Sequence, residues 1–311
     1  MTPQVFLEKS CQKLKTYKNN TEKWFGKLVN TLYYRIRYGG NYISVNCWVE
    51  QRCGHLYHRN FGDELNIYLM EAMTGKTVVS TQSVFQSSKP NYMVIGSILD
   101  SDTINSSSVV WGAGTMWGYD RSIKAKPQKV CAVRGKLTQR YLVSQGISCP
   151  DVYGDPALLM PLVYNPVVEK KYRIGVIPHV FDLDSPIVKR LTSLSTDLHV
   201  ISFENYKDWH HVIDEIKSCD FIISSSLHGL ILSDAYHIPN AWVKFSDKIH
   251  GGDYKYLDYF SGVNRNTSQV YIVKEEASFE DVCSLVKEYS PIEYDPSALL
   301  HACPFKINLA I

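Results

Sequence analysis

The chain of 311 residues has no C-x-x-C pair, no long apolar run and almost no net charge. Its eight cysteines are scattered, several of them in apolar segments, which favours reduced thiols and predicts a cytosolic protein. No segment approaches the roughly 18 apolar residues that a spanning helix needs, and no signal-peptide core is expected at the N-terminus. A formal charge of +2 argues against a nucleic-acid binder that relies on a basic surface.

Two cofactor patterns are incomplete. His55 and His58 lie near Cys47 and Cys53, but no second pair at ligand spacing follows, and a structural zinc site needs four ligands. The run Gly112–Gly114 is a G-x-G without the rest of a dinucleotide fingerprint. The sequence therefore predicts neither a metal nor a nicotinamide cofactor.

The positive charge is concentrated at residues 1–38, where eight lysines and arginines face two glutamates, a local +6 that leaves −4 elsewhere. Aromatic residues and leucines interleave with these charges, so we expect a basic amphipathic helix. Such a helix is typical of contact with an anionic membrane surface. A solvated helix docked on the following domain explains the pattern equally well.

Short β-rich runs then alternate with helical patterns in two series, over residues 39–165 and 166–311. This alternation predicts two Rossmann-like domains of the parallel α/β type, with a helix at about Glu280–Tyr289 closing the second. Ligands of open α/β sheets bind beyond the carboxyl ends of the strands, so the expected site is a cleft between the two halves.

One apolar strand ends at Ile223 and is followed by three serines and a histidine where a helix is predicted to begin. Exposed N–H groups at a helix start favour an anion, so Ser224, Ser225 and Ser226 are candidate donors to it, with His228 beside it. An ordinary N-cap at Ser226 is the alternative, although three serines exceed what one cap requires.

Two carboxylates lead another predicted helix. Asp63 and Glu64 follow Asn60 and Gly62, and both complement the positive end of that helix. A carboxylate in a cleft can instead orient or deprotonate a sugar hydroxyl. The spacing alone does not decide between these roles.

Trp111 and Trp117 flank Gly112 and Gly114 after a third predicted strand. Indoles stack on the apolar faces of sugar rings, and glycines let a ligand approach the backbone. The pattern therefore indicates sugar binding.

Charged and polar groups follow further strands. Arg134 can hold a carboxylate or phosphate with two hydrogen bonds, although a solvated surface pair with Lys136 is the simpler interpretation of these two residues alone. His179 follows another predicted strand, and we expect it either to face the cleft or simply to cap that strand. Asp155 lies in a turn before a short helix, and we expect it to be structural.

These motifs, in this order, resemble those of the polysaccharide pyruvyl transferase family. The matching segments, within residues 40–245, are Asn60-x-Gly62-Asp63-Glu64, Trp111–Thr115, Arg134-Gly135-x-x-Thr138, Gly154–Ala157, Ile174–His179 and Ser224–Gly229. The resemblance implies an α/β fold like that of GT-B glycosyltransferases. It also implies transfer of pyruvate from phosphoenolpyruvate to a sugar as a cyclic ketal, with phosphate released and no cofactor beyond that donor.

The resemblance places Arg134 and His228 at the donor. Our hypothesis for the mechanism is that His228 transfers the proton, Arg134 holds the anions of the donor, and Asp63 or Glu64 addresses the acceptor hydroxyls. The other residues expected at the donor are Ser224, Ser225, Ser226, Leu227, Gly229, Lys136 and His179, and those expected at the acceptor are Asn60, Gly62, Glu64, Trp111, Gly112, Gly114 and Trp117. Some family members carry an arginine where this chain has Ser226. A second donor cation is then needed, for which Arg173, Lys136 and Arg121 are candidates.

The implied acceptor is a galactose-type residue, modified as a 4,6-ketal on a lipid-linked repeat unit of a capsular or exopolysaccharide. This acceptor predicts a cytoplasmic protein, peripheral on the inner face of the membrane. A GT-B glycosyltransferase that uses a nucleotide sugar is one alternative, but it needs ribose and base contacts where this sequence offers a compact anion pocket. A catalytically silent glycan-binding module is the other.

Overall fold

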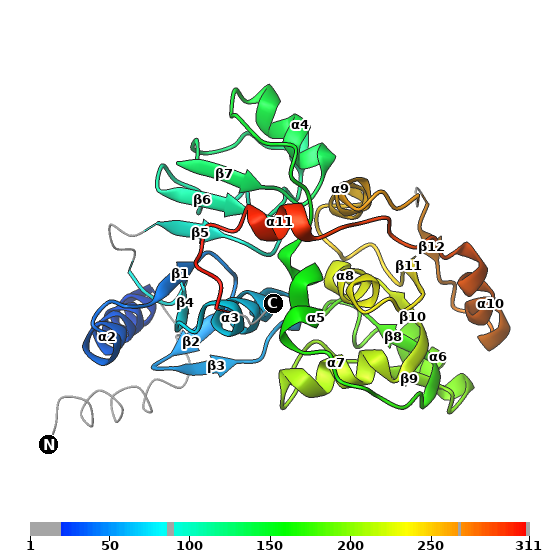
Figure 1. The fold of residues 1–311 in the computed structure, drawn as a ribbon. Coiled ribbons are helices and arrows are strands. Elements are labelled where there is room, and N and C mark those ends of the chain that lie inside the picture. The colour runs from blue at the N-terminus through cyan, green and yellow to red at the C-terminus, as the bar shows by residue number, and fades with distance from the viewer. Residues whose placement is uncertain (1–19, 86–89, 267–268, 309–311) are drawn as a thin grey trace, which may run out of the picture.

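The structure is a computed structural model that describes residues 20–85, 90–266 and 269–308 (Figure 1). Its two main sheets have the strand orders β4-β1-β5-β6-β7 and β12-β11-β10-β8-β9. The first comprises β1 (Ile43–Val45), β4 (Val78–Ser80), β5 (Asn91–Met93), β6 (Ser108–Trp111) and β7 (Lys129–Ala132), and the second β8 (Tyr172–Ile177), β9 (Leu198–Val200), β10 (Cys219–Ser224), β11 (Asn240–Lys244) and β12 (Tyr271–Ile272). A small antiparallel ladder joins β2 (Glu50–Arg52) to β3 (His55–Tyr57).

All strand pairs within the two main sheets are parallel, which confirms the predicted α/β class. Parallel strands are covered on both faces, and β10 shows the expected continuous apolar run, with Phe221, Ile222 and Ile223 buried. The first sheet draws its strands from residues 43–132 and the second from residues 172–272. The domain boundary near residue 165 and the GT-B arrangement remain predictions.

The helices surround the two sheets. They are α2 (Asn20–Tyr38), α3 (Phe61–Thr74), α4 (Lys136–Ser144), α5 (Met160–Val163), α6 (Pro186–Leu194), α7 (Trp209–Lys217), α8 (Leu227–Ala235), α9 (Tyr254–Gly262), α10 (Phe279–Ser284) and α11 (Ser297–His301), with 3-10 turns η1 (Gly118–Asp120), η2 (Pro156–Leu159) and η3 (Leu285–Glu288). Local chemistry sets several of these ends: Ser185 caps α6, and Pro186 suits its first turn. The predicted closing helix at Glu280–Tyr289 is divided into α10 and η3.

The end of the chain returns to the first sheet, although the prediction assigns residues 166–311 to the second domain. The indole N–H of Trp111 donates to the carbonyl of Leu299 in α11 at 2.8 Å. Farther on, the Asn308 N–H donates to the carbonyl of Met73 at 2.8 Å. Figure 1 shows α11, in red, beside the strands of the first sheet. These contacts tie the two halves of the chain together.

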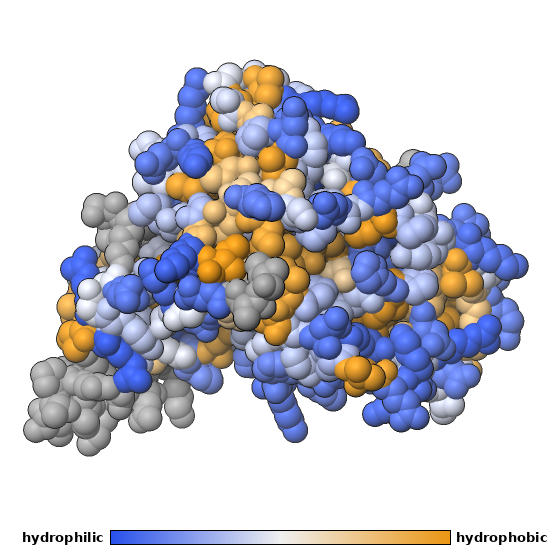
Figure 2. Space-filling model, in the orientation of Figure 1, coloured by the Kyte–Doolittle hydropathy of each residue, from blue (hydrophilic) through white to orange (hydrophobic). Residues whose placement is uncertain are grey.

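Of the predicted N-terminal helix at residues 1–38, the structure describes only α2; the rest lies outside the described residues. Tyr33 and Tyr34 of α2 are buried, whereas Trp24, Phe25 and Ile36 are exposed. Within the described ranges, no helix is both long enough and apolar enough to cross a membrane. In Figure 2, hydrophilic side chains interrupt the apolar ones across the visible face.

The prediction that all eight cysteines are reduced is wrong. Cys53 is disulfide-bonded, whereas six other cysteines are free thiols. Disulfide formation depends on the distance between two cysteines in the fold, which their spacing in the sequence does not reveal. Because disulfides are typical of oxidising compartments, the cysteine pattern no longer supports a cytosolic location.

Candidate active site

Hydrogen bonds of Ser224 hold the turn between β10 and α8 in place. The Ser224 hydroxyl donates to the Ile177 carbonyl at 2.8 Å and accepts the Ser226 N–H at 3.0 Å. A Cβ atom on Gly229 would lie 2.3 Å from the Ser224 oxygen, so the turn closes only around a glycine. Ser226 is the N-cap of α8 without a side-chain cap bond. Its hydroxyl and the first N–H groups of α8 therefore remain available to a ligand.

Ser225 holds the loop that follows β8. Its hydroxyl donates to Asp182 at 3.0 Å and accepts the His179 N–H at 2.9 Å. Burial, together with the positive charge of Lys255, lowers the pKa of His179 to about 4, so this imidazole is neutral at pH 7. Of the three serines predicted at the donor, Ser226 is thus the one whose hydroxyl lacks a partner within the described part of the chain.

His228 packs against the start of α3, which brings two of the predicted motifs together. A Cβ atom on Gly62 would lie 2.2 Å from Nδ1 of His228 and 2.8 Å from its Cγ, so the imidazole lies directly on the glycine backbone. Asn60 caps the same helix by accepting the Gly62 N–H at 3.2 Å, and its amide donates to Asp63 at 2.9 Å. Burial, together with the charge of Glu64, raises the pKa of Asp63 to about 7.

We expect Gly62→Ala to lower kcat by at least about tenfold while the protein stays folded. The added methyl group must displace the His228 ring, and errors of about 1 Å in a reacting group cost up to about 10²-fold in rate. Alanine itself favours the helix. Steady-state phosphate release and thermal melting measure the two effects. Gly39→Ala is the control for kcat, because its methyl group would point into open space. Its φ of 56° strains an alanine, so its melting temperature should fall while kcat stays unchanged. An unchanged kcat for folded Gly62→Ala would show that the ring position is unimportant.

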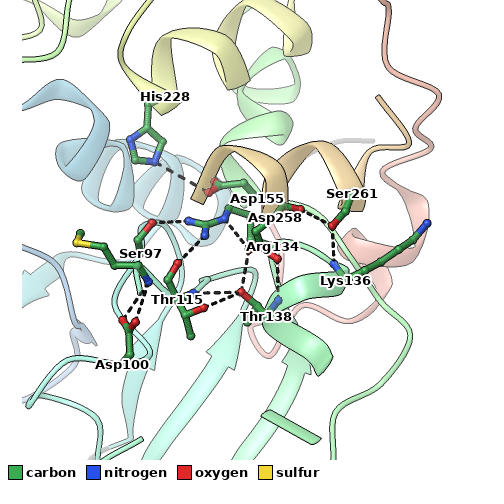
Figure 3. Close-up of polar contacts among 11 residues, drawn as sticks. Ser97, Asp100, Thr115, Arg134, Lys136, Thr138, Asp155, His228, Asp258 and Ser261 are labelled. Atoms are coloured by element: carbon green, nitrogen blue, oxygen red, sulfur yellow. Dashed lines mark hydrogen bonds and ion pairs between the residues drawn. The ribbon is translucent and has the colours of Figure 1, made fainter. Parts of the chain in front are cut away.

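His228 faces Asp155 across a short gap. Its Nε2 lies 4.0 Å from Oδ2 of Asp155 (Figure 3), and both atoms are buried without a hydrogen-bond partner in the described part of the chain. Burial lowers the pKa of His228 to about 3, and the charge of Arg134 contributes. Burial also raises the pKa of Asp155 to about 7, with a smaller contribution from Asp258. At neutral pH a neutral imidazole thus faces a carboxyl group that is half protonated.

Asp155 was expected to be structural, and one of its oxygens is. Its Oδ1 accepts the Ala157 N–H at 3.0 Å and so caps η2. Its other oxygen is the one directed at His228. Because an Asp-Pro turn accounts for this residue on its own, nothing in the sequence points to this second contact.

We expect Asp155→Asn to make the protein more stable at pH 8 but not at pH 4. The pKa of this carboxyl is about 7 in the folded chain against an ordinary 3.8, so wild-type stability falls as pH rises from 4 through 7. Asparagine keeps the cap acceptor and does not ionise. The gain at pH 8 should be on the order of 4 kcal/mol.

Melting temperatures at the two pH values measure this difference. Asp184→Asn, at a 93% exposed side chain, is the control and should show no such dependence. The same pH dependence in Asp155→Asn and wild type would assign the titration to another group.

Arg134 is fully buried in a network rather than exposed to a ligand (Figure 3). Its Nε donates to Asp258 at 2.9 Å, and its two terminal nitrogens donate to the Ser97 hydroxyl at 2.5 Å and to the Thr115 carbonyl at 2.8 Å. Asp258 in turn accepts the Thr138 N–H and hydroxyl, each at 2.8 Å. The charge of Arg134 is therefore balanced within the protein, and the pair joins the end of β7 to α9.

The glycines between the two tryptophans accommodate protein groups. A Cβ atom on Gly114 would lie 2.4 Å from Cζ of Arg134. One on Gly112, whose φ is 90°, would lie 2.2 Å from Cδ of Pro156. These glycines let the arginine and the Asp155 turn lie close to the end of β6.

Glu64 lies at the start of α3 but is saturated with hydrogen bonds. This buried carboxylate accepts the Arg59 and Asn60 N–H groups at 2.7 and 3.1 Å, and His58 lies 2.9 Å from its other oxygen. Tyr206, from the second half of the chain, donates to it as well. Glu64 therefore positions the helix start and leaves Asp63 as the carboxylate nearer to a ligand.

Three further predicted residues are buried or contact other groups. Trp111 is buried in the core. Trp117 is partly exposed, and Arg121 lies over its ring at 5.5 Å. The Lys136 ammonium group donates to Asn264 at 2.9 Å and points away from the histidine (Figure 3). Of the two tryptophans, Trp117 is the one with surface left for a sugar.

No group of three or more His, Cys, Asp and Glu side chains in the described ranges is arranged to hold a metal ion. The residues that meet around His228 come instead from the ends of β7 and β10, the start of α3, the Asp155 turn and α9. They are the buried pair of His228 and Asp155, buried cations and the start of a helix.

Comparison with known sequences agrees with this geometry. The sequence profile described as polysaccharide pyruvyl transferase matches residues 60–247. The chain belongs to the polysaccharide pyruvyl transferase family. This confirms the resemblance drawn from its motifs. The chain is therefore a transferase of the pyruvyl class, from a family that acts in polysaccharide biosynthesis.

Two curated proteins show how far the similarity extends. An uncharacterized protein of Acanthamoeba polyphaga mimivirus is 31% identical over 232 residues, which cover 71% of this pyruvyl transferase family member and 78% of the viral protein. The succinoglycan biosynthesis protein ExoV of Rhizobium meliloti is 24% identical over 208 residues, 65% of this chain and 61% of that protein. The family match contains Gly62, Arg134, Asp155 and His228 but ends before α9.

Proposed function

We propose that this pyruvyl transferase takes pyruvate from phosphoenolpyruvate and adds it to two hydroxyls of a sugar, forming a cyclic ketal and releasing phosphate. The pairing of His228 and Asp155 beside buried cations is the observation that carries this proposal. The reaction needs a proton donor and acceptor next to a binding site for an anion. The start of α8 offers the pair of His228 and Asp155 for the proton, and its first N–H groups for the anion.

The proposed chemistry balances without a cofactor. A proton is added to the methylene carbon of the donor, which makes its C2 electrophilic. One sugar hydroxyl attacks C2, the bond from C2 to the phosphate oxygen breaks, and the second hydroxyl attacks C2 to close the ring. Of the two protons that the hydroxyls lose, one replaces the proton added to the methyl group and the other leaves on phosphate.

Asp155 and His228 divide these proton transfers. Asp155 holds a proton in half of the molecules at neutral pH, whereas His228 is neutral and can accept one. Nε2 of His228 is the atom that exchanges a proton with Asp155 and presents it to the donor. General acid–base groups of this kind contribute about 10²–10⁴-fold to a rate.

The two parallel sheets support a GT-B-like arrangement, with the acceptor on the side of residues 39–165 and the donor on the side of residues 166–311. Asp63 is the proposed contact of the acceptor hydroxyls. The relative named for succinoglycan biosynthesis supports an exopolysaccharide acceptor, for which a 4,6-ketal on a lipid-linked galactose-type residue is our specific proposal. We propose that the exposed Trp24, Phe25 and Ile36 of α2 contact the membrane that carries this acceptor.

The test is incubation with phosphoenolpyruvate and a panel of galactose- and mannose-containing acceptors. We expect phosphate release that depends on the acceptor, and a product heavier by one pyruvate less one water. Turnover of a nucleotide sugar in place of phosphoenolpyruvate would favour a glycosyltransferase. Acceptor binding without turnover of either donor would favour a glycan-binding module. Either result would overturn the proposal.

A further inference from the structure

Lys255 is a buried cation that the network around Arg134 leaves unpaired. It is only 7% exposed, and its ammonium group forms no hydrogen bond or ion pair with any residue in the described ranges. Its Nζ lies over the ring of Tyr256, 5.3 Å from the ring centroid. Lysines are rarely buried to this degree without a partner. An unpaired buried ammonium group is therefore a candidate ligand contact.

The position of Lys255 on α9 directs it toward the candidate active site. It precedes Asp258 by three residues, so the two side chains lie on the same face of the helix. Asp258 binds Arg134 at 2.9 Å. The charge of Lys255 acts on Arg134, Asp63 and His228, which lie around the same point.

A hydrogen bond fixes α9 against the serine turn. Tyr256, next to Lys255, donates its hydroxyl to the Ser225 carbonyl at 2.7 Å. This bond holds Lys255 close to the start of α8, where Ser226 and the first N–H groups are free of partners in the described part of the chain. An ammonium group beside a helix start is a combination that suits a phosphate.

The charges of the site leave room for an anion. Arg134 is balanced by Asp258, which is equally buried. Asp63 is the carboxylate whose charge acts on Lys255, and burial keeps the pKa of Asp63 near 7. Burial lowers the pKa of Lys255 to about 8, so most of these ammonium groups are charged at pH 7. Because an uncompensated charge is costly when buried, a bound anion would stabilise the site.

We propose that Lys255 binds the phosphate group of the donor, together with Ser226 and the start of α8, and that Arg134 positions this site through Asp258 without touching the donor. This inference rests on the proposed function for the identity of the donor. The cations suggested by the sequence are engaged elsewhere. Arg121 lies over Trp117, Arg173 over Phe279, and Lys136 binds Asn264.

The test compares Lys255→Met with wild type by calorimetric titration of phosphoenolpyruvate and of inorganic phosphate. We expect both ligands to bind the variant roughly 10- to 100-fold more weakly, because a charge-assisted contact in a buried site is lost. The melting temperature should be unchanged or higher, since the variant removes a buried charge. Lys287→Met, at an exposed lysine, is the control and should bind as wild type does.

Lys255→Arg separates charge from fold if the methionine variant does not fold. Wild-type affinity for phosphoenolpyruvate should fall as pH rises through about 8, where Lys255 loses its proton. The arginine variant should lack this fall, although Asp63, His179 and His228 still face the site in both proteins. Equal affinity of wild type and Lys255→Met, or an equal fall with pH in wild type and Lys255→Arg, would overturn the role of Lys255. Failure of wild type to bind phosphoenolpyruvate would instead overturn the proposed function.

Discussion

His228→Ala should lower kcat for phosphate release by about 10²–10⁴-fold, which is the contribution of a general acid–base group. The imidazole is the group that faces the protonated Asp155, so its removal breaks the path by which a proton reaches the donor. Affinity for phosphoenolpyruvate should change much less than kcat. Burial lowers the pKa of His228 to about 3, so the free protein carries no positive charge there for the donor to lose.

The separation of kcat from KM distinguishes this role from a structural one. His211→Ala, at a 69% exposed side chain on α7, is the matched control and should retain wild-type kinetics. The melting temperature of each variant shows whether it is folded. Near-normal turnover by folded His228→Ala would remove this histidine from the chemistry.

The parts of the fold that the sequence predicts well are those with strong local patterns. The helices Pro186–Leu194 and Trp209–Lys217 follow from local sequence, because a serine and an aspartate cap them and each has a clear apolar stripe. The strand before Ser224 is equally clear, because its apolar run is continuous. For this reason the sequence alone was enough to identify His228 at the start of a helix.

The partners of these residues were not predictable in the same way. Asp258 lies 124 positions from Arg134 in the sequence, and only the packing of α9 against the end of β7 joins them. Lys255 shares this helix, which lies outside the matched motifs. Trp111 shows the opposite case: an indole beside glycines is typical of a sugar site, but this one lies in β6, which is buried throughout. Local patterns identify residue types, whereas pairing across the fold assigns their roles.

Asp258→Ala should destabilise the protein by about 3–5 kcal/mol, as is typical when one member of a buried ion pair is removed. Both side chains are fully buried, so the change leaves the Arg134 charge without its carboxylate. The N–H and hydroxyl of Thr138 lose their acceptor as well. Denaturant unfolding measures the loss. Asp184→Ala removes an exposed ion pair with Lys189 and should cost at most about 1 kcal/mol.

The double variant Arg134→Met/Asp258→Leu tests whether the unpaired charge is the cause. Replacing a whole buried ion pair with apolar groups is often neutral or stabilising, so the double variant should recover most of the stability that Asp258→Ala loses. Turnover should remain low, because hydrogen bonds of the pair fix the end of β7 to Ser97, Thr115 and α9. A double variant as unstable as the single one would show that the loss comes from packing, since no buried charge would then remain unpaired at this position.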